Sequence, residues 1–333
     1  MNNIFKILSV FVFCVVMAAC SKSSSNYVTP IRDYALQYAD DVDSIEKYVS
    51  THYMTVDPVT FDVTFTKIGT GGQQSIKDQT LYPLKDTTVV QNGINYKFHY
   101  IRFREGTERR PTQVDSINII YKGVTLKDHT ISENNPNEID FDAAPTPVWL
   151  KLQEVISGWA HVIPMFKTGT YTAGTGGNPT TYNNFGAGVM FLPSALAYYS
   201  NSTVSIPSYS PIIFTFKLIE LRYRDHDYDG ILSKDERVLD PSISPLFRWK
   251  ENPASSYHNI DSQGVEFDVP FMDTDGDGVA NMYDVDDDGD HVLTRVEIKN
   301  PLGGLYLYNL IPDCSGNTTS ATRVRKHLDS ACH

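Results

Sequence analysis

The sequence predicts an α+β protein, in which a helix precedes a β-rich middle region and a series of acidic loops follows it. Three observations lead to this prediction. Apolar residues between Ile31 and Val49 recur every three or four positions, as they do along one face of a helix. Several later segments alternate apolar and polar residues, as strands do. Between Asp225 and Glu297 there are 19 acidic and 5 basic residues. The negative charge of this segment therefore exceeds the net charge of the whole 333-residue chain, which is -12.

The first segment, residues 1–19, has the composition of a signal peptide. Lys6 precedes an apolar run from Ile7 to Val16, which is shorter than the roughly 20 residues that span a membrane. The sequence MAAC, which ends at Cys20, resembles a bacterial lipobox. This resemblance implies that Cys20 is lipidated, that residues 20–30 form a tether, and that the exported protein is anchored to the bacterial envelope. A resemblance to envelope lipoproteins of the Bacteroidetes type implies the outer membrane. The alternative is an unmodified Cys20 beside an ordinary cleavage site.

An N-terminal helix and β extension is expected over residues 31–91. The apolar positions of the helix are Ile31, Tyr34, Tyr38, Val42, Ile45, Tyr48 and Val49. This face can pack on the protein's own domain, the commoner arrangement, or form a dimer surface. Residues 61–69 then alternate like a strand, and the sequence GTGGQQ ends it.

The middle of the chain is β-rich. Residues 94–104 and 116–121 alternate in polarity, and residues 211–221 form an apolar run of the length of a buried strand. Residues 170–186 are rich in Gly, Thr, Asn and Tyr and predict an exposed loop. This loop lacks the Gly-Lys-Ser/Thr ending of a phosphate-binding loop, so no nucleotide site is expected. The acidic net charge also argues against a nucleic-acid partner.

The acidic stretch contains three copies of the EF-hand calcium-loop pattern, which places carboxylates at positions one, three, five and twelve and a turn glycine at six. We call them the first loop (Asp225–Glu236), the second loop (Asp273–Asp284) and the third loop (Asp286–Glu297). The third loop has His291 in place of the turn glycine, and histidine tolerates a positive φ less well. The expected ligands are Asp225, Asp227, Asp229, Ile231 through its carbonyl, Glu236, Asp273, Asp275, Asp277, Asp284, Asp286, Asp288, Asp290 and Glu297.

Calcium is expected to have a structural and not a catalytic role in this region, residues 223–300. Calcium modules of exported proteins bind weakly and stay loaded where the ion is abundant. The close spacing of the second and third loops resembles the aspartate repeats of thrombospondin type 3. Without the ions, the aspartates should repel one another and the region should unfold. The alternative, a disordered acidic segment, fits poorly with the interleaved Val279, Met282 and Val292.

The tail, residues 301–333, contains two cysteines. Cys14 lies in the signal peptide and Cys20 is the lipidation site, so the folded part retains Cys314 and Cys332. In an exported protein these two residues are expected to form one disulfide that closes the tail.

Separated motifs in the middle of the chain resemble the FKBP-type peptidyl-prolyl isomerase family. They are, in order, DSINIIYKG (115–123), IDFDAA (139–144), EVISGWAHVIPMFKTG (154–169), LPSALAY (192–198) and IPSYSPIIFTFKLIEL (206–221). The resemblance covers residues 92–222 and implies a bent antiparallel sheet wrapped on a short helix, with the active pocket between them. Carried over position by position, the pocket residues are Tyr121, Phe141, Asp142, Val155, Ile156, Trp159, Tyr198, Ile206 and Phe214. Val148, where the family often has an aromatic residue, and the insertion at residues 170–186 depart from the family pattern.

The resemblance implies peptidyl-prolyl isomerisation during the folding of exported proteins, with proline-containing polypeptides as substrates. Rotation about an X-Pro bond is slow because it destroys amide resonance. A dry aromatic pocket can favour the twisted transition state over the charge-separated planar amide without a nucleophile. Asp142 is expected to orient hydrogen bonds and not to transfer a proton. The alternatives are an FKBP-fold chaperone or binding module without turnover, and a surface protein built mainly around its calcium repeats. The aromatic set could also be plain hydrophobic core.

Overall fold

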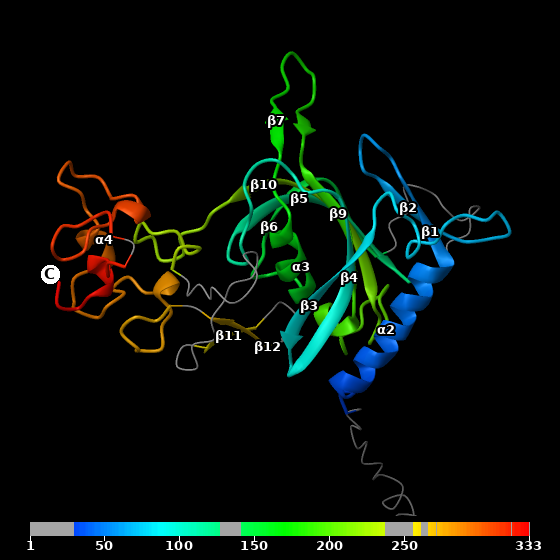
Figure 1. Cartoon of the computed structure of the whole chain (residues 1–333), viewed down its shortest axis with the longest axis horizontal. Helices are drawn as coiled ribbons and strands as arrows, with labels where there is room; N and C mark the ends of the chain where they lie inside the picture. Colours follow the sequence, from blue (N-terminus) through cyan, green and yellow to red (C-terminus); the bar gives the residue numbers. More distant parts are fainter. Residues whose placement is uncertain are drawn as a thin grey trace, which may run out of the picture. The chain divides into compact units, whose positions relative to one another are not determined.

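The computed structural model describes residues 30–126, 141–236, 256–260, 266–270, 272–320 and 322–332. The expected signal peptide and the expected lipidation site, Cys20, lie outside these ranges. Every element discussed below belongs to one compact unit, residues 33–333 (Figure 1). Across the described ranges, no helix is both long enough and apolar enough to cross a membrane.

Helix α2 (Tyr34–Thr51) corresponds to the expected N-terminal helix. Asp33 caps it, because its Oδ1 atom accepts hydrogen bonds from the N–H groups of Ala35 at 2.9 Å and Leu36 at 3.0 Å. The apolar face of the helix buries Ile45, Tyr48 and Val49 against a sheet of the same chain. The helix is therefore part of the folded domain that follows it.

A buried carboxylate also fixes α2 to the short helix η2 (Ser194–Leu196). The Oδ2 atom of Asp41 accepts hydrogen bonds from the backbone N–H of Ser194 at 2.7 Å and from its hydroxyl at 2.6 Å. Its Oδ1 atom accepts a third bond from the Gln37 amide at 2.7 Å. Asp41 therefore joins two segments that are far apart in the sequence.

Six strands form one antiparallel sheet in the order β3-β4-β9-β10-β5-β6. They are β3 (Leu84–Gln91), β4 (Ile94–Arg104), β5 (Ser116–Thr125), β6 (Asp142–Lys151), β9 (Gly186–Leu192) and β10 (Ile212–Arg222). The three strands expected at residues 94–104, 116–121 and 211–221 correspond to β4, β5 and β10. Strand β3 precedes residue 92, the expected start of the isomerase domain, but it pairs with β4 in the same sheet.

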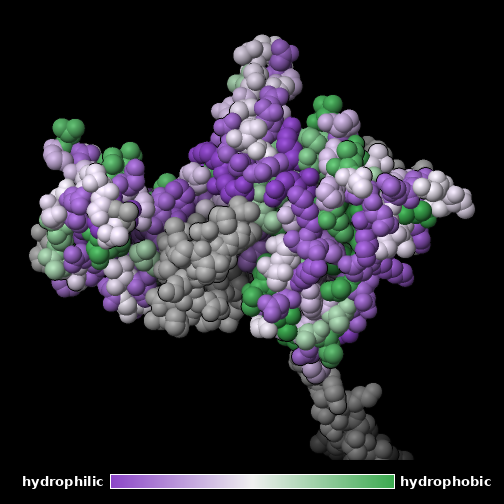
Figure 2. All heavy atoms as spheres, in the orientation of Figure 1, coloured by the Kyte–Doolittle hydropathy of each residue, from purple (hydrophilic) through white to green (hydrophobic). Residues whose placement is uncertain are grey.

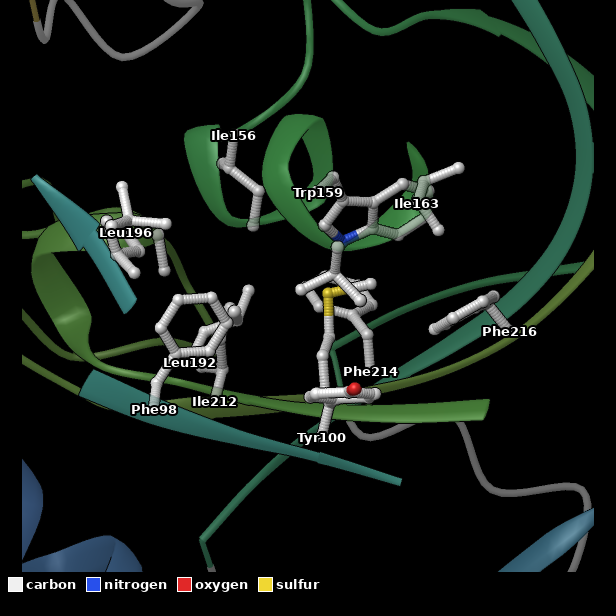
Figure 3. Packing of buried hydrophobic residues seen from close by; sticks show 14 of the residues in the cluster. Phe98, Tyr100, Ile156, Trp159, Ile163, Leu192, Leu196, Ile212, Phe214 and Phe216 are labelled. Carbon is white, nitrogen blue, oxygen red and sulfur yellow. The ribbon is translucent and has the colours of Figure 1, made fainter. Parts of the chain in front are cut away.

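The two faces of this sheet carry separate hydrophobic clusters. On one face, Ile101, Phe191 and Ile213 pack with the apolar side of α2. On the other face, Phe98, Leu192, Phe214 and Phe216 pack beneath helix α3 (Ser157–Val162), as Figure 3 shows. Side chains alternate between the faces of a strand, so β10 contributes neighbouring residues to both clusters. The sheet thus supports α2 on one side and α3 on the other.

Within the described ranges, three strand pairs lie outside the main sheet. They are β1 (His52–Val56) with β2 (Val63–Lys67), β7 (Thr170–Thr172) with β8 (Thr181–Asn183), and β11 (Ser256–Ile260) with β12 (Glu266–Pro270). Strand β2 lies within the expected strand at residues 61–69. The segment expected to be an exposed loop, residues 170–186, is largely exposed up to residue 184, whereas Phe185 and Gly186 are buried; residues 170–172 and 181–183 pair as the β7–β8 hairpin, drawn at the top of Figure 1.

The C-terminal region has its own small core. Ile231, Ile298 and Ile311 are buried together, with Leu305 and Tyr308 packed against them. The elements of this region are η3 (Asn281–Tyr283), α4 (Thr294–Glu297), η4 (Tyr308–Leu310) and η5 (Lys326–Leu328). A disulfide joins Cys314 to Cys332, with Cα atoms 5.5 Å apart. On the face drawn in Figure 2, hydrophobic side chains occur in separate small groups among hydrophilic ones.

Candidate functional site

A cavity of about 180 Å³ lies beside α3 and is lined by residues of β5, β6 and β10. Most of the expected pocket residues line it: Tyr121, Asp142, Val155, Ile156, Trp159, Tyr198 and Phe214. The fold therefore brings together residues that are almost a hundred positions apart in the sequence. Leu150 and Glu154, which were not expected, complete the lining.

Trp159 lines this cavity and contacts two of its other aromatic side chains. Only 3% of the residue is exposed, and the rings of Tyr121 and Phe214 each meet it edge to face with centroids 5.0 Å apart. Such edge-to-face pairs stabilise aromatic clusters beyond the area they bury. The indole Nε1 atom is buried and has no hydrogen-bond partner within the described part of the chain. The site therefore combines a dry aromatic surface with one unused donor.

Two tyrosines and a carboxylate form the polar wall of the cavity. The Tyr121 hydroxyl donates a hydrogen bond of 2.9 Å to the Oδ2 atom of Asp142. Burial, and then the neighbouring Asp142, raise the pKa of Tyr121 and also that of Tyr198. Both phenols are therefore protonated donors at neutral pH. The hydrogen bond to Asp142 restricts the position of the Tyr121 hydroxyl.

Two expected pocket residues do not line the cavity. Phe141 lies outside the lining and packs on Phe214, with ring centroids 5.4 Å apart. Gly123 makes this approach feasible, because a Cβ atom at that position would lie 2.4 Å from the Phe141 ring. Ile206 is buried in the same hydrophobic cluster, where it supports the cavity from behind its lining.

The three acidic loops share one backbone arrangement. At position six, the N–H of Gly230 donates to Asp225 at 3.2 Å, that of Gly278 to Asp273 at 3.2 Å, and that of His291 to Asp286 at 2.9 Å. The φ values of these three residues are 106°, 93° and 75°. His291 therefore adopts the left-handed conformation that the turn requires, and the third loop closes like the other two.

Position nine closes each loop from the opposite side. The N–H at position two donates to the side chain at position nine, from His226 to Ser233 at 3.2 Å, from Thr274 to Asn281 at 2.9 Å and from Asp287 to Thr294 at 3.1 Å. These three acceptor side chains are buried. Position nine thus shapes the loop, which leaves the carboxylates to face one another.

Each loop gathers three carboxylates whose oxygens lie within 4.8 Å of one another. The groups are Asp225, Asp227 and Asp229; Asp273, Asp275 and Asp277; and Asp286, Asp288 and Asp290. Burial, and then the charge of Asp229, raise the pKa of Asp227 to about 8. Crowded carboxylate oxygens of this kind are the ligands that a hard cation such as Ca²⁺ prefers.

The residues at position twelve differ among the loops. Glu236 and Glu297 are buried, and neither carboxylate has a hydrogen-bond partner among the residues described. Burial is the main cause that raises the pKa of Glu236 to about 11 and that of Glu297 to about 8. Asp284 instead accepts a hydrogen bond from the N–H of Asp286 at 3.0 Å. The first and third loops therefore offer a free carboxylate at position twelve, and the second loop offers a partly occupied one.

A fourth carboxylate group was not expected from the sequence. Asp229, Glu236 and Asp287 also bring their oxygens within 4.8 Å of one another, although Asp287 belongs to the third loop. Burial, and then the charges of Asp229 and Asp227, raise the pKa of Asp287 to about 9. The sequence indicated this group only through the residue type at position two. The third loop has an aspartate there, Asp287, whereas the first loop has His226 and the second has Thr274.

Gln153 links the edge of the cavity to the first loop. Its amide nitrogen donates to the hydroxyl of Tyr283 at 3.0 Å, and its oxygen accepts from Nε2 of His226 at 2.8 Å. The Nδ1 atom of His226 then accepts from the Ser233 hydroxyl at 2.7 Å. A chain of hydrogen bonds therefore runs from Ser233 of the first loop through His226 to Gln153. Gln153 directly precedes Glu154 and Val155, which line the cavity.

Comparisons with known proteins give one family match and several similar solved structures. The family described as BamM C-terminal matches residues 226–321, which is less than half of the chain. No curated protein matches the sequence.

Several solved structures are similar to this chain. One is a peptidyl-prolyl cis-trans isomerase from Pseudomonas syringae pv. tomato, 20% identical over 40% of this chain and 80% of that chain, with a TM-score of 0.28. Another is FkpA from Escherichia coli, 17% identical over 66% of this chain and 72% of that chain, with a TM-score of 0.30. A third contains the three FKBP domains of wheat FKBP73, 15% identical over 41% of this chain and 51% of that chain, with a TM-score of 0.27. At this level of similarity, any inference about activity has to come from the cavity itself.

Proposed function

We propose that this protein is a peptidyl-prolyl cis-trans isomerase of the FKBP type that assists the folding of exported proteins. The observation that carries the proposal is the aromatic cavity: Trp159 lines it, and the rings of Tyr121 and Phe214 meet the indole edge to face with centroids 5.0 Å apart. The cavity, of about 180 Å³, is of a size to receive a proline ring. Among the described residues, its lining includes no serine, cysteine or histidine, and isomerisation needs no nucleophile.

The cavity can lower the barrier by treating the planar and twisted amides differently. A planar X-Pro amide carries the charge separation of resonance, and rotation removes it at a cost of about 18–20 kcal/mol. When Trp159 and Phe214 replace water around the bond, the planar form loses more solvation than the twisted form. The protonated hydroxyl of Tyr198 can donate to a substrate carbonyl, while Asp142 holds Tyr121 in position.

We further propose that calcium braces the C-terminal region and that a lipid on Cys20 anchors the protein to the bacterial envelope. The buried, unpartnered carboxylates of Glu236 and Glu297 support the first part, since buried charges require a compensating ion or hydrogen bonds. The second part depends on the sequence around Cys20 alone.

The test is the isomerisation rate of a short X-Pro peptide with the purified chain from residue 20 onward. We expect acceleration by the wild-type protein and at least a tenfold loss in the Trp159→Leu variant. Trp149→Leu is the matched control, because Trp149 is 37% exposed and stacks on Arg222 away from the cavity lining. If the wild-type protein does not accelerate the reaction, the proposed isomerase activity is refuted.

The same assay with added calcium and with a chelator separates the role of the cavity from that of the acidic loops. Equal rates in both arms would mean that the ion has a structural role only, whereas loss of rate in chelator would mean that it also shapes the cavity. A protein that suppresses aggregation of an unfolded chain but has no turnover would instead be a binding module. Val148, an aliphatic residue at a position where an aromatic one is frequent in FKBP proteins, is the feature that favours this second candidate.

A further inference from the structure

We propose that Asp287 of the third loop is a ligand of the cation held by the first loop, so that one ion ties the two loops together. The inference builds on the proposed calcium binding and assigns it a residue outside the EF-hand positions. By the loop pattern, Asp287 occupies position two, which does not ligate the ion of its own loop.

The geometry brings the three carboxylates to one point. Asp229 and Glu236 are positions five and twelve of the first loop, and their oxygens lie within 4.8 Å of an oxygen of Asp287. The third loop can present this side chain because its backbone is closed by the bond from the N–H of Asp287 to the Thr294 hydroxyl at 3.1 Å. The peptide of Asp287 is therefore fixed in the third loop while its carboxylate reaches the first.

The environment of these carboxylates indicates a cation site and not a solvated acidic patch. The exposed fractions of Asp287, Asp229 and Glu236 are 1%, 2% and 3%. Neither oxygen of Asp287 or of Glu236 has a hydrogen-bond partner among the described residues, and Oδ2 of Asp229 also has none. Carboxylates that are buried at this spacing stay ionised together only with a positive charge between them. A hard dication that accepts several oxygens meets this requirement.

This additional ligand gives the three loops different expected affinities. The first loop gains a buried carboxylate beyond its own set, which would supply a further oxygen to an ion held there. In the second loop, Asp275 and Asp277 are exposed, and the described residues place no carboxylate from another loop in its group. We therefore expect the first loop to bind calcium most tightly, and we expect its occupation to order the third loop at the same time.

The experiment is calcium titration by calorimetry of the chelator-treated chain from residue 20 onward, with Asp287→Asn as the test variant. Asparagine keeps the shape of the side chain and removes a buried charge, so the variant is expected to fold. We expect the tightest calcium site to weaken at least tenfold. The control is Asp235→Asn, because Asp235 lies next to Glu236 but pairs with Lys234 at 2.7 Å, and it should change affinity less than threefold.

A double-variant comparison distinguishes ligation from a general effect of charge. If Asp287 and Glu236 hold the same ion, the combination of Asp287→Asn with Glu236→Gln should lose little more affinity than either single change. Asp287→Asn combined with Asp273→Asn, in the second loop, should give additive losses. If the wild-type protein binds no calcium, the proposed calcium function fails. If it binds calcium and Asp287→Asn behaves like Asp235→Asn, only the role of Asp287 is refuted.

Discussion

Replacement of Asp41 by alanine should strongly destabilise the protein, although the residue lies in neither the cavity nor the acidic loops. The Asp41 carboxylate is 1% exposed and accepts three hydrogen bonds, two of them from Ser194. Ser194 is 0% exposed, so water cannot replace the lost acceptor without a local opening of the structure. The substitution therefore leaves a backbone N–H and a hydroxyl of Ser194 buried and unpaired.

The magnitude follows from these orphaned groups. Each buried donor without a partner costs about 1–3 kcal/mol, and two such donors remain on Ser194. Alanine offsets about 0.5 kcal/mol of this through its higher helix propensity. Loss of the charge itself also offsets part, because burial raises the pKa of Asp41 and so disfavours its ionised form. We expect a net loss of about 3 kcal/mol in the free energy of unfolding, a large part of the roughly 5–15 kcal/mol typical of a domain.

Urea unfolding monitored by tryptophan fluorescence measures this loss. Asp43→Ala is the matched control, because Asp43 is an exposed aspartate on the same helix and its replacement should change stability by less than about 0.5 kcal/mol. If the free energy of unfolding of Asp41→Ala lies within about 1 kcal/mol of the wild-type value, the Asp41–Ser194 contact does not hold α2 to η2 and the reasoning is wrong.

Three further outcomes are expected. Tyr121→Phe removes the hydrogen bond to Asp142 and should lower kcat/KM on an X-Pro peptide about fivefold to tenfold; Tyr171→Phe, in the exposed β7–β8 hairpin, should leave it unchanged. Burial lowers the pKa of His161 from 6.5 to about 4, so the unfolded chain binds more protons between these values and stability should rise with pH across this window. Because the side chain is half-buried, we expect the free energy of unfolding, measured with urea, to rise by about 1–3 kcal/mol between pH values of about 4.5 and 7. His161→Gln should reduce this rise, and an unchanged pH profile in the variant would show that other groups cause it. Gln153→Ala removes the bonds to Tyr283 and His226 and should lower thermal stability by the equivalent of about 1–2 kcal/mol, whereas Gln73→Ala, at an exposed position, should have no measurable effect.

Local signals in the sequence predicted the local features of the fold. Strand β4 spans the expected residues 94–104 because its apolar and polar residues alternate clearly. The acidic loops were recognisable because the groups that hydrogen-bond to close each loop lie within the same twelve consecutive residues. Residues 225–236, 273–284 and 286–297 can therefore be aligned with one another by their residue types alone.

Other elements lacked such a signal for physical reasons. Strand β9 is buried along its whole length, so its residues do not alternate in polarity. Strand β3 is an edge strand with several exposed positions, and its apolar pattern is correspondingly weak. The roles of Gln153 and Asp287 arise from contacts with residues more than fifty positions away, which no local pattern reports.

The position of β10 in the sheet has a consequence for how the chain is assembled. This strand lies between β9 and β5, yet it is the last of the six to be synthesised. Until residues 212–222 are available, the β3-β4-β9 group and the β5–β6 hairpin each have an open edge, and open strand edges favour association with other chains. Phe214 belongs to the same strand, so the aromatic cavity also forms at this late step. The nascent chain would therefore need protection from association until residues 212–222 have been synthesised.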